Sequence, residues 1–172
     1  MPNRVEEATS AAMGAIKDVK ATVKGLTGVF KHLMEEHGKV STLITRVKMS
    51  SDEEVRARLY PTIRSELLGH ETGELMAVYP AMAPFPEVRG IAEEHARDAG
   101  ELQRQIAEVD RYSYGDAGWG PAFHRLAELV QKHVTAEESD YFPKAHKAMG
   151  DDLSKKLLPI FESAKKKTMP TA

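Results

Sequence analysis

The chain has 172 residues, of which 41% are hydrophobic and 29% are charged, with a formal net charge of −2 and no cysteine. This length predicts one domain, and no window is long and apolar enough for a membrane span. The near-neutral charge argues against nucleic-acid binding, and the N-terminus lacks an apolar signal region, so we expect a cytoplasmic protein. Without cysteine, disulfides and thiolate metal sites are excluded, and any metal must be held by histidine and carboxylate side chains.

Apolar residues recur every three or four positions along the chain, which predicts an all-helical protein. Over residues 1–28 this spacing predicts an amphipathic helix whose apolar stripe runs from Val5 to Leu26. We expect this helix to pack against the rest of the molecule, against a second copy of the chain in a homodimer, or against a partner protein. Its stripe is rich in alanine and therefore does not suit a membrane surface.

Four longer helices are predicted over approximately residues 29–48, 50–79, 87–112 and 121–141. Pro61 either kinks the second of these helices or marks its start, and the proline-rich residues 80–86 form a rigid connection that cannot be helical along its whole length. Long helices joined by short loops predict an up-down-up-down four-helix bundle over residues 29–149. Residues 150–172 are expected to add a short C-terminal helix and a tail.

The two halves of this bundle repeat a pattern of histidine and glutamate. In each half, a histidine that follows two glutamates on the first helix is followed by a His-x-x-x-Glu pair on the second. A spacing of four places the two side chains of such a pair on one face of a helix. Two facing hairpins therefore bring together His37, His70, Glu74, His95, His133 and Glu137. Buried carboxylates are costly without a cation, so the pattern predicts a metal site, and mixed imidazole and carboxylate ligands suit iron or manganese.

These motifs, with the aromatic-proline pairs Tyr79-Pro80 and Phe142-Pro143 at matching offsets after them, resemble the hemerythrin-like family, also called HHE cation-binding domains. The resemblance covers about Val29 to Met149 and implies a four-helix bundle with a non-haem di-iron centre. Carried over position by position, it implies that the four histidines ligate two Fe ions. Glu74 and Glu137 would then bridge the ions, together with an oxide or hydroxide.

Two assignments stay open, and one position departs from the family's oxygen carriers. The family's oxygen carriers place the last carboxylate five residues after its histidine, which makes Glu138 a rival to Glu137. The carriers also have a fifth histidine where this chain has Ala99, so the matching halves imply two accessible and nearly equivalent irons. Glu71 follows His70 directly and is either a ligand, a hydrogen-bonding neighbour of the site or a solvent-exposed residue.

Several further residues are expected to lie away from the ligand set. Glu36 and Glu94 precede two of the histidines, and we expect them to face solvent, although a hydrogen bond to a ligand is the alternative. Tyr79 and Phe142 are expected to pack in the apolar core and to take no part in redox chemistry. Helical geometry directs His32 and His124 away from the site. His146 follows Pro143 and is expected to lie outside the bundle.

The resemblance implies a di-iron protein that binds or turns over a small oxidant, which is dioxygen, peroxide or nitric oxide. The missing histidine at Ala99 argues against reversible oxygen carriage and favours reaction with peroxide or nitric oxide. The alternative is an iron-binding module, or a sensor of iron or oxygen, that performs no turnover. In such a module, metal loading would change the docking of the N-terminal or C-terminal helix.

Overall fold

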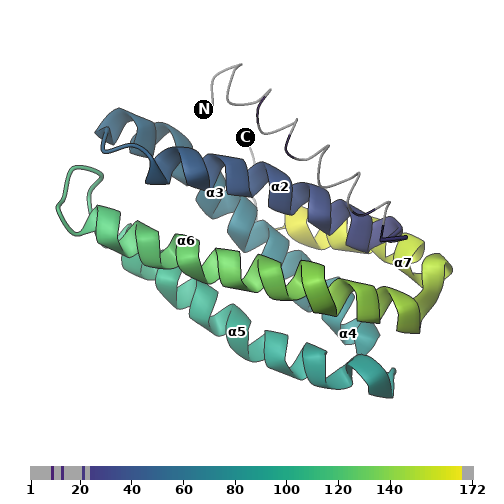
Figure 1. Ribbon diagram of the computed structural model, residues 1–172. Coiled ribbons are helices and arrows are strands. Elements are labelled where there is room, and N and C mark those ends of the chain that lie inside the picture. The colour runs from purple at the N-terminus through teal and green to yellow at the C-terminus, as the bar shows by residue number, and fades with distance from the viewer. Residues whose placement is uncertain (1–8, 10–12, 14–20, 22–23, 168–172) are drawn as a thin grey trace.

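The computed structural model of the protein describes residues 24–167 and three isolated positions before them. All regular secondary structure in this part of the chain is helical, as the sequence predicts. Figure 1 shows four long helices side by side, which confirms the four-helix bundle: α2 (Gly28–Lys48), α3 (Glu53–Gly73), α5 (Pro86–Asp110) and α6 (Trp119–Ala136). The helix predicted over residues 1–28 lies almost entirely outside the described residues.

Two of the long helices continue through a π-helical turn. α3 passes through η1 (Glu74–Val78) into α4 (Tyr79–Met82), and α6 passes through η2 (Glu137–Tyr141) into α7 (Phe142–Lys166). At the end of each turn a backbone amide donates to the carbonyl five residues earlier instead of four. The helices therefore extend beyond the predicted ends at residues 79 and 141, and only residues 83–85 separate α4 from α5.

Some of the prolines in these helices occupy positions that a helix tolerates, whereas others lie in a helix interior. Pro80 and Pro143 fall in the first turn of the α-helical segment after each π turn, where a missing N–H is not needed. α3 begins at Glu53, behind the capping side chain of Asp52, and runs through Pro61. Pro61 is thus inside a continuous helix and does not mark its start.

A sharp corner divides α7 at Gly150, whose backbone has φ 78° and ψ 168°. Residues 142–149 prolong the fourth helix of the bundle, and residues 151–166 form the predicted C-terminal helix. This C-terminal helix returns along α2 and α3, where Figure 1 shows it in yellow. At its start, the Ser154 hydroxyl donates to the Thr27 carbonyl at 2.6 Å.

Buried apolar side chains form two clusters. One cluster contains Leu59, Trp119 and Phe123, and the other contains Phe30, Phe161 and further residues from α7. Along α2, α3, α5 and α6, the buried histidines and glutamates lie between members of the two clusters. The bundle therefore carries a polar layer between two apolar regions.

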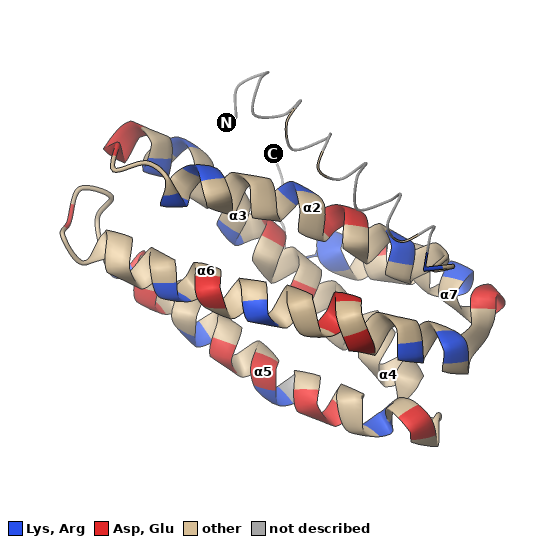
Figure 2. Cartoon of the chain, viewed as in Figure 1, with Lys and Arg blue, Asp and Glu red and all other residues tan. Residues whose placement is uncertain are grey.

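Charged residues of both signs lie on the outer helices of the bundle. Figure 2 shows acidic and basic residues interspersed along α5 and α6. None of the helices in the described part of the chain combines the length and the hydrophobicity that a membrane span requires.

Because the C-terminal helix lies close to the start of α2, we expect a side chain at Gly28 to lower the stability of the protein. Gly28 has a φ of 53°, and a Cβ there would overlap the backbone of Ser154. Gly28→Ala should therefore lower the free energy of unfolding by about 2–4 kcal/mol, through strain and a clash together. Gly25→Ala is the matched control because its φ is 71° and its Cβ would meet nothing within 4 Å, so we expect a loss of only about 1 kcal/mol. Urea denaturation measures both values, and equal losses would contradict the close approach.

Candidate metal centre

The six residues predicted from the repeat converge in the middle of the bundle. Glu74 and Glu137 are completely buried, and each is the first residue of a π turn. One hairpin contributes His37 from α2, His70 from α3 and Glu74 from η1, and the other contributes His95 from α5, His133 from α6 and Glu137 from η2. Each hairpin thus presents two imidazoles and one carboxylate to the same polar layer.

Each carboxylate lies between histidines of both hairpins. Glu137 Oε1 is 3.1 Å from Nε2 of His133, four residues earlier, and its Oε2 is 3.3 Å from Nε2 of His37 on the other hairpin. Glu74 Oε2 is 3.5 Å from Nε2 of His70 and 3.6 Å from Nε2 of His95, which belongs to the second hairpin. A carboxylate in this position can bridge two metal ions.

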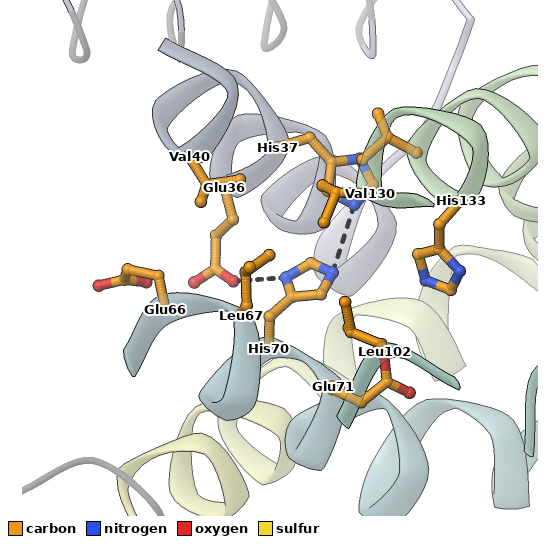
Figure 3. A pocket seen from close by; sticks show the side chains of 11 residues that line it. Glu36, His37, Val40, Glu66, Leu67, His70, Glu71, Leu102, Val130 and His133 are labelled. Carbon is orange, nitrogen blue, oxygen red and sulfur yellow. Dashed lines mark hydrogen bonds and ion pairs between the residues drawn. The ribbon is translucent and has the colours of Figure 1, made fainter. Parts of the chain in front are cut away.

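The histidines lie in pairs. Nε2 of His37 and Nε2 of His70 are 3.3 Å apart and are joined by a dashed line in Figure 3. The rings of His95 and His133 have centroids 4.9 Å apart. Two nitrogen ligands at adjacent positions of one metal ion lie about 3 Å apart, because each metal–nitrogen bond is about 2.1 Å long. Ligand atoms that lie within 4.8 Å of one another form two groups, which are His37, His70 and Glu137, and Glu71, Glu74, His95 and His133.

Glu71 belongs to this polar layer, although its role was left open by the sequence. Its side chain is 1% exposed, and its Oε1 lies 2.8 Å from Nε2 of His95. The solvent-exposed alternative for Glu71 is therefore wrong. In the second hairpin the matching position is Val134, which has no ligand atom, so the two halves are less alike than the repeat predicts.

Aromatic side chains from each hairpin cover a histidine of the other. The ring of Tyr79 stacks on His95 with centroids 3.6 Å apart, and Phe142 stacks on His37 at 5.6 Å. The Tyr79 hydroxyl also donates to Glu137 Oε1 at 2.8 Å. Tyr79 was expected only as a core residue, but it is in direct contact with the site.

Two further glutamates bind the outer nitrogens of the first histidine pair. Nδ1 of His70 lies 2.9 Å from Glu36 Oε2, and Nδ1 of His37 lies 3.1 Å from Glu138 Oε1. A carboxylate on the outer nitrogen orients an imidazole and leaves Nε2 for a metal. Glu36, expected to face solvent, is instead mostly buried. Glu138 contacts the outer side of His37, whereas Glu137 lies between the histidines.

The other histidines outside the repeat have different surroundings. His124 is exposed on α6, as predicted. His32 and His146 are half-buried: His32 contacts Glu36 and the ring of Phe161, and His146 lies 3.0 Å from the hydroxyl of Thr27. The burial of His32 was not predicted, and it results from the C-terminal helix that covers this part of α2.

The site meets a chemical test for a bound cation. Seven buried side-chain atoms of the polar layer make no well-aligned hydrogen bond, although several of them lie close to another ligand atom of the site: Glu71 Oε1, both carboxylate oxygens of Glu74, both ring nitrogens of His95, His133 Nε2 and Glu137 Oε2. Such atoms cost free energy unless they are satisfied by another group. Imidazole nitrogens and carboxylate oxygens are ligands of iron, manganese and zinc, so these residues fit a metal ion.

The protonation equilibria of the metal-free site are strongly perturbed. Burial and the neighbouring carboxylates Glu137 and Glu71 raise the pKa of Glu74 well above its usual value. Burial also opposes ionisation of Glu137, but the imidazoles of His133 and His37 outweigh it and hold the pKa of Glu137 well below the usual value. Burial disfavours the imidazolium of His133, yet the charge of Glu137 raises the pKa of His133 to about 9.

These shifts predict how the stability of the metal-free protein depends on pH. Because the folded-state pKa of His133 is raised from 6.5 to about 9, its contribution is fully present below pH 6.5 and is lost as the pH rises to about 9. The raised pKa values of His37 and Glu74 act in the same direction. Urea denaturation should show a decrease on the order of 1–3 kcal/mol between these pH values, and a smaller one in His133→Gln. A flat or rising profile would contradict the prediction.

Comparisons with known proteins agree with this geometry. The family model of the Hemerythrin HHE cation binding domain matches residues 28–145. The chain is 24% identical over 166 residues to a DNA nickase of Nostoc sp. (strain PCC 7120), a match that covers 95% of this chain and 47% of the nickase. It is 23% identical over 143 residues to an uncharacterized hemerythrin-like protein of Schizosaccharomyces pombe, covering 82% of this chain and 70% of that protein. The chain thus spans about half the length of the nickase, and no solved structure matches it significantly. The bundle, the converging histidines and glutamates, and the match over most of the chain identify it as a member of the hemerythrin HHE cation-binding family.

Proposed function

We propose that the protein binds two iron ions and uses them to bind or turn over a small oxidant, which is peroxide, nitric oxide or dioxygen. The main observation in support is the placement of Glu74 and Glu137 between histidines of both hairpins, since two bridging carboxylates suit a pair of ions. The donor set contains no sulfur and is typical of non-haem iron.

The two groups of ligand atoms suggest how the residues divide between the ions. His37 and His70 would hold one ion, and His95 and His133 would hold the other, with Glu74 and Glu137 shared between them. Glu71 would add a carboxylate to the second ion alone, so the two ions would differ, in contrast to the equivalence expected from the repeat. When bound, the iron pair would supply the redox chemistry, while the chain holds the ions and excludes bulk water.

A small cavity beside the histidines supports the proposal that the ligand is a small molecule. It has a volume of about 30 Å³, and its walls include His37, His70, Glu71 and His133. The remaining walls are mainly aliphatic, and Figure 3 shows Leu67, Leu102 and Val130 around the imidazoles. Pockets for organic ligands have volumes of about 300–1,000 Å³, so this cavity suits a molecule of two or three atoms.

The similarity to a DNA nickase does not lead us to propose DNA as a substrate. Binding to DNA depends on rows of lysine and arginine that neutralise phosphates. The chain has a net charge of −2, and acidic and basic residues are interspersed along α5 and α6 (Figure 2). A supercoiled-plasmid assay tests this exclusion directly.

The metal stoichiometry is the first test of the proposal. Protein produced with iron should contain close to two irons per chain by elemental analysis. Glu74→Ala and Glu137→Ala should each lower this number, and the double variant should lose most of the metal, because both carboxylates lie among the histidines. Full loading of the folded double variant would rule out the bridging assignment.

Glu138→Ala is the matched control for that experiment. Glu138 contacts His37 at its outer nitrogen, Nδ1, so its loss should weaken iron binding by about 10–100-fold without removing a ligand. With iron in excess, the Glu138→Ala protein should still bind two irons. A loss of iron in Glu138→Ala but not in Glu137→Ala would assign the bridging role to Glu138.

Reactivity tests the second part of the proposal. Ala99 is buried one turn after His95, so no further imidazole protects that side of the site. The iron-loaded protein should decompose peroxide or react with nitric oxide in stopped-flow measurements, and Ala99→His should slow this reaction by adding a ligand. A long-lived reversible complex with dioxygen, without reaction with peroxide or nitric oxide, would refute this part. Metal binding without any turnover would favour the sensing alternative.

A further inference from the structure

The C-terminal helix, residues 151–166, lies outside the region that matches the family, residues 28–145. It nevertheless covers the α2 and α3 side of the metal centre. The ring of Phe161 stands edge-on to His70 with centroids 6.0 Å apart, and a Cβ at Gly73 would overlap the same ring. The helix is therefore packed against a segment that carries a candidate ligand.

The last turn of this helix carries a mostly buried lysine. Nζ of Lys165 donates to Glu36 Oε1 and to Glu66 Oε2, each at 2.6 Å. The side chain of Lys165 is 11% exposed and that of Glu36 is 12% exposed. A pair of charges this far from water is strongly sensitive to the loss of either partner.

The second oxygen of the same carboxylate reaches the metal centre. Glu36 Oε2 accepts from Nδ1 of His70 at 2.9 Å, and Nε2 of His70 then faces Nε2 of His37 (Figure 3). The hydrogen bonds of a neutral imidazole decide which of its two nitrogens carries the proton. A nitrogen that faces a carboxylate keeps the proton, and the other nitrogen is then unprotonated. Glu36 therefore keeps the proton on Nδ1 and leaves the Nε2 lone pair free to bind a metal.

We propose that Lys165 is a positioning residue for the metal centre, which holds Glu36 against His70 and so couples docking of the C-terminal helix to metal binding. The inference rests on the proposed function for the metal and on the structure alone for the tautomer of His70. Linkage makes the coupling reciprocal: the docked helix favours metal binding at His70, and bound metal favours the docked helix.

The test compares the full-length protein with Lys165→Met, which keeps the aliphatic stem and removes the charge. In the metal-free protein, long-range ¹H–¹⁵N spectra should show His70 as the Nδ1–H tautomer, and Lys165→Met should give a mixture of tautomers. In anaerobic titrations with Fe²⁺, the wild-type protein should have two tight sites. The variant should keep one of them and bind the other iron about 10–100-fold more weakly.

Two control variants separate positioning from a general effect on the helix. Lys155→Met removes an exposed lysine from the same helix and should behave like the wild type. The Nζ of Lys155 lies 4.0 Å from the carboxylate of Asp151. Lys165→Arg keeps the positive charge and should restore the tautomer and most of the iron affinity. A purely structural role for Lys165 would not predict a selective change in the spectrum of His70.

Hydrogen exchange provides a measurement that needs no variant. The amides of residues 151–166 should exchange at least severalfold more slowly in the iron-loaded protein than in the metal-free protein, whereas equal exchange would overturn the coupling. A wild-type tautomer and wild-type iron affinity in Lys165→Met would overturn the positioning role. If the wild-type protein binds no iron but Lys165→Met still changes the tautomer of His70, the proposed function fails while the positioning role stands.

Discussion

The structure depends on the burial of three carboxylates at one level of an otherwise apolar bundle. Glu71, Glu74 and Glu137 are each no more than 1% exposed, and apolar clusters lie on both sides of them. An ionised carboxylate in such surroundings is costly unless it is paired, and the same low polarity strengthens every charge interaction that it makes. The histidines of all four long helices satisfy only part of this requirement. Packing of the bundle buries these carboxylates at a cost in free energy, and a bound cation would reduce that cost.

The π turns are the local feature that fits this polar layer to the helices. Glu74 and Glu137 each open such a turn, and a proline follows six positions later in both hairpins. A proline cannot donate to the carbonyl four residues before it, so the regular ladder is already interrupted at that point. Short π-helical segments occur frequently at functional sites. Here they lie directly beside Tyr79 and Phe142, whose rings cover histidines of the opposite hairpin.

The sequence predicted those features that depend on spacing within one helix. Helical periodicity identified the bundle, and a separation of four residues identified both His-x-x-x-Glu pairs. The features that it missed depend on segments distant in the sequence. Glu36 is buried because the C-terminal helix covers it, and Glu71 is buried because His95 of the other hairpin lies 2.8 Å away. Neither neighbour is visible from local spacing. The π turns were also missed, since a pattern of i and i+4 positions assumes a regular α-helix.

The exchange of ligands between the hairpins has a mechanical consequence. Each group of ligand atoms contains residues from before and from after the connection at residues 83–85, so neither hairpin alone provides a complete group. An ion in either group would act as a cross-link between the halves of the chain, in a protein that has no cysteine to form a disulfide. Such a link would disfavour separation of the hairpins while leaving each helix free to fray at its ends. Loss of the ions would weaken the contact between the two hairpins before either hairpin unfolded.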